Sequence, residues 1–154
     1  MARAQDHGPE WLSGYTAAAL RAELGQALRD LAGRVPTAAA EAATEFETAV
    51  LLYEREGTGR LRGHVNALIG VADARTLLAD AAGASEALRA ACTLAVRLRS
   101  RHTEERLREV VSRARQRFPR DPALRELTDR LRDPVPGAVP IPVAALPVQA
   151  FTRT

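Results

Sequence analysis

Residues 42–49 read Ala-Ala-Thr-Glu-Phe-Glu-Thr-Ala, and residues 84–91 read Ala-Ser-Glu-Ala-Leu-Arg-Ala-Ala. Each stretch places one large residue, Phe46 or Leu88, four positions after an alanine and three positions before another. These spacings put the three side chains on one face of an α-helix. Alanine lets two helices approach closely, and the large residue fills the space between them. Each stretch therefore predicts a helix that packs tightly against a neighbour.

The two stretches repeat at a constant offset of 42 residues. An internal repeat of about this length, in which each unit is a pair of helices, is typical of an α-solenoid. We therefore predict an all-α fold, a short α-solenoid of antiparallel helical hairpins, over residues 10–133. Residues 1–9 are expected to be a disordered leader. Residues 134–154 are rich in proline and apolar side chains, and they are expected to form an extended tail.

Hydrophobic periodicity predicts six helices, over residues 11–32, 37–56, 59–79, 82–99, 103–118 and 122–132. The first carries a stripe of leucines at positions 20, 24, 28 and 31. Gly57 is predicted to supply the C-terminal turn of the second helix. Thr103 is predicted to cap the fifth helix, and Asp121 the sixth, with Pro122 at its first position.

Composition excludes several classes of protein. The chain of 154 residues has 22 Arg, no Lys, one Cys and only 4% aromatic residues. A disulfide framework and a Cys-rich metal site are excluded, as is chemistry that needs a lysine. The scarcity of aromatic and β-branched residues argues against a sandwich or barrel. The single Cys92 lies in an apolar helical register, which favours a small core residue over a nucleophile.

Charge is distributed unevenly along the chain. Residues 1–56 hold five Arg and nine acidic residues, whereas residues 57–154 hold 17 Arg and ten acidic residues. The densest stretch, residues 97–120, holds nine Arg. These arginines are interpreted mainly as residues on solvated helix faces, in a chain that uses Arg in place of Lys throughout. A basic surface that associates with nucleic acid is the alternative.

The repeat resembles the second helix of a tetratricopeptide repeat, and Leu24-Gly25 resembles the Leu-Gly of the first helix. The order of elements over residues 13–132 is similar to the C-terminal repeat region of actinobacterial Xre-type transcriptional regulators. In the second unit Leu68 and Arg75 stand where the family has aromatic residues. Because no helix-turn-helix is found ahead of the repeats in this sequence, we expect either a stand-alone repeat protein or a truncated relative, with a protein partner favoured over DNA.

Catalytic and metal chemistry find little support. His7, His64 and His102 are far apart in sequence, and neither of the last two has a second ligand four residues later. A metal site needs three or four converging ligands. We therefore expect a non-enzymatic protein without metal or cofactor.

Binding is the favoured function. The first helices of successive hairpins are expected to line a concave face. The predicted ligand-binding residues are Gln26, Arg29, Asn66, Asp73, Arg108 and Arg115, accompanied by Ile69, Thr76 and Val111. Asn can hold a peptide backbone, and Arg can clamp a carboxylate. The expected ligand is a peptide or protein segment with an acidic group.

The expected compartment is the cytoplasm, because the sequence shows no signal peptide and no membrane-spanning run. Self-association is also expected, since a short solenoid leaves apolar faces at its ends. A third possibility is an accessory subunit that docks on another protein through residues 134–154.

Overall fold

The computed structural model describes residues 16–132, and every regular element in that range is helical. The helices are α1 (Ala17–Leu31), α2 (Ala38–Glu56), the short 3-10 turn η2 (Thr58–Arg60), α3 (Leu61–Leu77), α4 (Ala81–Ala95), α5 (Arg101–Arg117) and α6 (Pro122–Arg132). All six predicted α-helices are present in the described range. The expected leader and the expected Pro-rich tail lie outside it.

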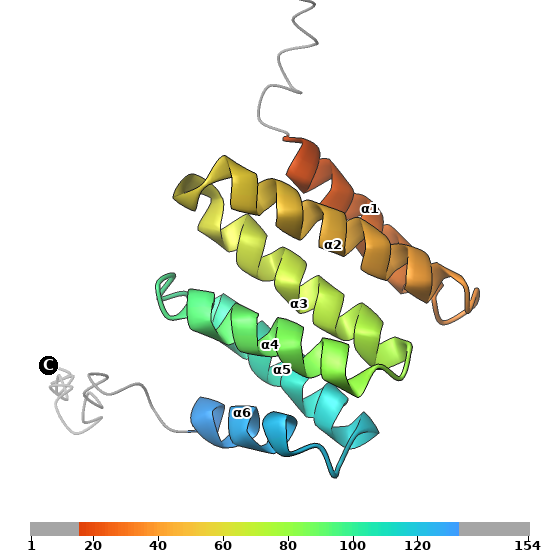
Figure 1. Cartoon of the computed structure of the whole chain (residues 1–154), viewed down its shortest axis with the longest axis vertical. Coiled ribbons are helices and arrows are strands. Elements are labelled where there is room, and N and C mark those ends of the chain that lie inside the picture. The colour runs from red at the N-terminus through yellow and green to blue at the C-terminus, as the bar shows by residue number, and fades with distance from the viewer. Residues whose placement is uncertain (1–15, 133–154) are drawn as a thin grey trace, which may run out of the picture.

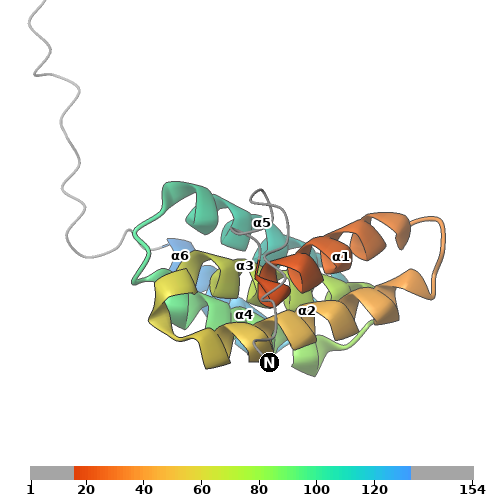
Figure 2. The same ribbon diagram turned by 90° about the horizontal axis from the view of Figure 1, so that it is seen from above.

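Consecutive helices run in alternating directions and form a row from α1 to α6 (Figure 1). Each helix packs against the next, and α1 and α5 also pack against α3. Seen from above, α1 and α5 lie on one side of the row, while α2 and α4 lie on the other (Figure 2). The short connections explain the alternation, since a few residues can only return the chain antiparallel to the helix before.

The repeated alanine pattern forms the core. Ala42, Phe46 and Ala49 are buried in α2, and their counterparts Ala84, Leu88 and Ala91 are buried in α4. The ring of Phe46 reaches two glycines on different helices: a Cβ added at Gly25 would lie 3.0 Å from it, and one added at Gly70 would overlap it. Glycine at these positions lets α1 and α3 approach the ring from two sides.

The leucine stripe of α1 is divided between two faces. Leu28 packs against the core, but Leu20, Leu24 and Leu31 are 52%, 45% and 49% exposed. α1 packs only against α2 and α3, and no described helix covers its other face. The first helix of the row therefore presents an open apolar surface.

Two of the predicted helix ends are confirmed, and one predicted cap is wrong. Gly57, with φ +78°, ends α2, and the Asp121 side chain accepts from the backbone N–H of Leu124 at 3.0 Å. The predicted cap at Thr103 is wrong. Helix α5 begins two residues earlier at Arg101, so Ser100 is the cap and its hydroxyl accepts from the N–H of Thr103 at 3.4 Å. No helix among residues 16–132 is long and apolar enough to cross a membrane.

Candidate functional site

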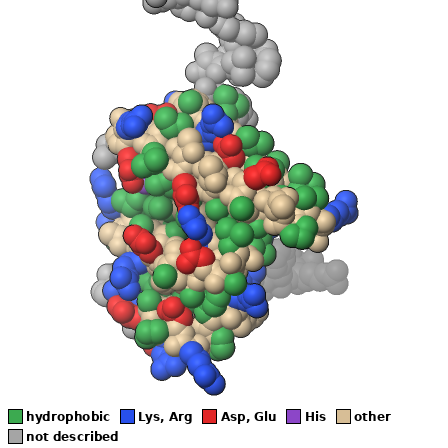
Figure 3. Space-filling view, turned by 45° about the vertical axis from the view of Figure 1, so that its right-hand side comes forward, with side chains coloured by type: hydrophobic (Ala, Val, Ile, Leu, Met, Phe, Trp, Pro, Cys, Tyr) green, Lys and Arg blue, Asp and Glu red, His purple; other side chains and the backbone are tan. Residues whose placement is uncertain are grey.

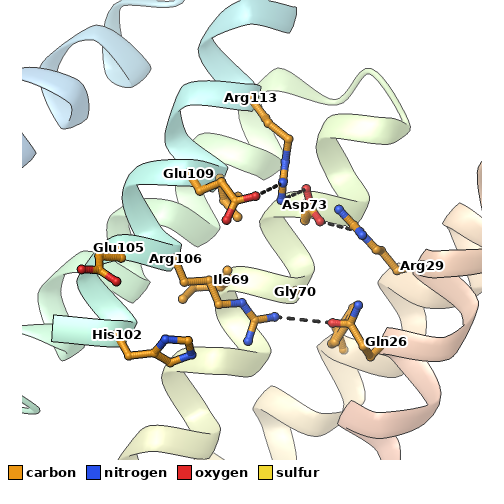
Figure 4. Close-up of a pocket in the computed structure, with 12 residues that line it drawn as sticks. Gln26, Arg29, Ile69, Gly70, Asp73, His102, Glu105, Arg106, Glu109 and Arg113 are labelled. Atoms are coloured by element: carbon orange, nitrogen blue, oxygen red, sulfur yellow. Dashed lines mark hydrogen bonds and ion pairs between the residues drawn. The ribbon is translucent and has the colours of Figure 1, made fainter. Parts of the chain in front are cut away.

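A groove of about 570 Å³ lies between α1, α3 and α5. Helix α3 forms its floor, because the backbones of α1 and α5 both pack on α3 but not on each other. Gln26 and Arg29 come from α1, Ile69, Gly70 and Asp73 from α3, and His102, Glu105, Arg106, Glu109 and Arg113 from α5 (Figure 4). Phe46 of α2 also lines the groove, so its lining comes mainly from α1, α3 and α5, with one residue of α2.

Asp73 is the charged centre of the groove. It is 8% exposed, and it accepts hydrogen bonds from Arg29 Nε at 2.6 Å and from Arg113 Nη2 at 3.1 Å (Figure 4). The two arginines lie on opposite walls, so one carboxylate joins α1, α3 and α5. Glu109 accepts a further hydrogen bond from Arg113 at 2.7 Å. Hydrogen bonds between charged groups are about twice as strong as neutral ones, so this network fixes the spacing of the walls.

The guanidinium of Arg29 stays charged in this setting. Burial lowers its pKa, but the charges and hydrogen bonds of Asp73 and Asp30 together raise it by more, and the net shift is upward. Arg29 therefore keeps its positive charge beside the Asp73 carboxylate, with which it forms an ion pair. Arg29 and Arg113 serve chiefly to organise the groove, because both are already bound to carboxylates.

Arg106 is the groove cation that remains available. Its Nη2 lies 3.4 Å from the side-chain oxygen of Gln26 on the opposite wall, at the outer limit of a hydrogen bond. Among residues 16–132 no carboxylate lies within 4.0 Å of it, as the ion pairs of α5 show. His102 lines the groove beside it (Figure 4). Arg106 can therefore take an anionic group without first giving up an ion pair.

The predicted binding residues fall into three groups. The structure brings Gln26, Arg29 and Asp73 together in the groove, along with Ile69. Arg108 and Arg115 line a different cleft, between α5 and α6. Asn66 is half-buried on α3 and lines neither cavity.

Two other predicted positions are not part of the groove surface. Thr76 is buried, and its hydroxyl donates to the carbonyl of Ala72 at 2.8 Å. Val111 is buried beside the α5–α6 cleft.

The separation of Arg108 and Arg115 from the groove has a geometric cause. The apolar stripe of this helix, which includes Leu107 and Ala114, faces the core. Arg106 and Arg113 flank the stripe on one side, whereas Arg108 and Arg115 flank it on the other. The sequence does not tell which flank turns toward α1. The structure shows that it is the flank with Arg106.

Other reactive groups are placed away from the groove. Cys92 is buried in the core, and burial raises the pKa of its thiol, with Arg130 lowering it in part. In the described range no three His, Cys, Asp or Glu side chains are grouped so that they could hold a metal ion. The groove is thus a polar surface with fixed ion pairs and one available cation, an arrangement suited to recognition.

Comparison of the chain with protein-family models, with curated proteins and with solved structures gives no match in any of the three.

Proposed function

We propose that the protein is a non-enzymatic interaction or regulatory module that binds a peptide or protein segment in the α1–α3–α5 groove. In this reading the row of helices is a short α-solenoid of antiparallel hairpins, and the groove is its concave face. The observation that carries the proposal is the available Arg106, held opposite Gln26 above a floor fixed by Asp73. The resemblance of the sequence to tetratricopeptide repeats is consistent with this use.

The chemistry of the groove favours a peptide with an acidic group. Arg106 offers a planar fork that matches a carboxylate, and the Gln26 amide can both donate to and accept from a peptide backbone. Ile69 on the floor supplies apolar contact. Recognition sites of this kind combine apolar contact area with a few polar groups that set orientation.

The distribution of arginine favours a protein ligand over nucleic acid. Arg106 and Arg113 line the groove, whereas Arg108 and Arg115 line the α5–α6 cleft. The arginines of α5 are therefore divided between two surfaces and do not form the continuous stripe that tracks a phosphate backbone. On the face shown in Figure 3, acidic and basic side chains alternate among apolar ones.

We expect Arg106→Gln to weaken binding of acidic peptides by about tenfold, the usual value of a hydrogen bond to a charged group. The measurement is fluorescence anisotropy, with members of a labelled library of Asp- and Glu-containing peptides titrated against the full chain.

The matched control is Arg108→Gln, which removes a guanidinium from the same helix but from the α5–α6 cleft. It is expected to leave the peptide affinity unchanged. An unchanged affinity in Arg106→Gln, or an equal loss in both variants, would contradict the assignment of the groove.

We also propose that the protein self-associates. A second copy of the chain would pack on the open face of α1. Leu20, Leu24, Ala27 and Leu31 are exposed there at spacings of four, three and four residues. That pattern is the seam of a coiled coil, in which a helix pairs with another of its own kind.

We expect the full chain, 16.6 kDa as a monomer, to show a dimer mass by light scattering after size-exclusion chromatography. Leu24→Glu places a charge in the middle of the seam and is expected to yield monomers. The control Leu51→Glu changes another exposed leucine, which lies on α2. A monomeric parent chain, or the same mass for both variants, would refute α1 as the interface.

A further inference from the structure

A second cleft, of about 680 Å³, lies between α5 and α6. It is on the flank of α5 that faces away from the groove. Three arginines line it, Arg108, Arg115 and Arg132, and none of its lining residues is acidic. Three cations around one concavity repel one another, and an anion bound among them would relieve that repulsion.

The nearest acidic side chains compensate this charge only weakly. Glu104 lies 3.7 Å from Arg108 and is partly exposed, and Asp129 lies 4.0 Å from Arg132 and is exposed, so both ion pairs are long. Pairs of this kind contribute little. Arg115 has no carboxylate within 4.0 Å among residues 16–132, where the ion pairs on its helix involve other arginines. The cleft thus carries a positive charge that the described part of the chain leaves largely unneutralised.

The cleft also has a defined shape. Arg108 Nε donates to the backbone carbonyl of Leu131 at 3.2 Å, which ties this guanidinium to the last turn of α6. Val111 and Leu131, with Pro119, supply an apolar lining. Ser112 and Gln116 add neutral donors beside the arginines. The lining of the cavity therefore combines charged and apolar side chains.

We propose that this cleft binds a small organic phosphate monoester, with the phosphate among the arginines and an aliphatic body on Val111 and Leu131. A phosphate dianion matches several guanidinium forks at once, whereas a single carboxylate needs only one. The volume is in the range of small-molecule sites. No aromatic residue lines the cleft, so it offers no stacking platform for the bases of a single-stranded nucleic acid.

This site is separate from the peptide groove. The cleft uses Arg108 and Arg115, and the groove uses Arg106, so either assignment can fail while the other stands. A ligand held by Arg108 and Arg115 of α5 and by Arg132 of α6 would also join the last two described helices. Binding is therefore expected to raise the melting temperature of the chain.

The test is isothermal titration of the full chain with n-hexyl phosphate, inorganic phosphate and n-hexanoate. Hexyl phosphate is expected to bind most tightly, because only it has both the dianion and the apolar body. Arg115→Gln is expected to weaken it by about tenfold or more. Arg117→Gln, an exposed arginine of the same helix outside both cavities, is expected to leave the affinity unchanged.

Each alternative outcome overturns the proposal in a specific way. No saturable binding of hexyl phosphate to the full chain would refute the site. Equal affinity for hexanoate would refute the preference for phosphate, and equal affinity for inorganic phosphate would refute the apolar subsite. Equal losses in Arg115→Gln and Arg117→Gln would show nonspecific charge attraction. Displacement by a generic DNA duplex that binds more tightly would assign the surface to nucleic acid. Circular dichroism of both variants shows whether a loss of binding reflects misfolding.

Discussion

Phe46→Ala is expected to lower the free energy of unfolding by about 3–5 kcal/mol, the usual cost of deleting a buried aromatic ring. Phe46 is 3% exposed, and its ring fills the space between Gly25 of α1 and Gly70 of α3. Neither glycine has a side chain that could move into the cavity. The site therefore relaxes poorly, and the loss should fall toward the upper end of that range.

The measurement is urea denaturation followed by circular dichroism, with Leu51→Ala as the control. Leu51 lies on the same helix but is 57% exposed, so its replacement is expected to change stability by less than about 0.5 kcal/mol. A loss below about 1 kcal/mol for Phe46→Ala would show that the ring does not hold α1 and α3 together.

The second large effect is expected at Gly70. A Cβ added there would lie 2.6 Å from Cζ of Phe46, which is too close for any side chain, so the buried ring would have to shift. Overpacking of this kind costs about 1–3 kcal/mol, partly offset by the better helix propensity of alanine. Gly70→Ala is thus expected to destabilise the protein, even though alanine favours a helix.

Two further variants separate the clash from a general effect of glycine replacement. Gly33→Ala is expected to be neutral or slightly stabilising, because an added Cβ there meets no atom within 4 Å. In the Phe46→Leu background, Gly70→Ala should cost less than it does in the parent chain, because the smaller side chain leaves room. Strict additivity of the two changes in denaturation experiments would contradict a direct contact.

The sequence was sufficient to predict the helices and, for α2 and α4, which face of each helix is buried. A large residue between two alanines at helical spacing, with turn signals such as Gly57 between the repeats, defines which face of a helix is buried. The buried sets around Phe46 and Leu88 confirm this. The pattern works because burial on one face is a local property of each helix.

The lining of the groove could be predicted only in part, because it depends on how helices are rotated relative to one another. Arg106 and Arg108 are equally polar and flank the same apolar stripe, so periodicity gives them the same status. Only the packing of α5 on α3 decides that Arg106 faces the groove. Leu24 is a second example. Its helical spacing matches that of a packed residue, but its side chain lies on the open face of α1.

The floor of the groove constrains how this protein can change. Every residue of α3 from Ala67 to Ala74 is buried, because the helix packs against α1, α2, α4 and α5. A substitution within that run alters a packed contact, so the shape of the floor cannot change without disturbing the neighbouring helices. The walls are different: Gln26 and Arg106 are only partly buried and tolerate exchange. Substitutions that change the groove would therefore occur on α1 and α5, while the residues of α3 stay the same.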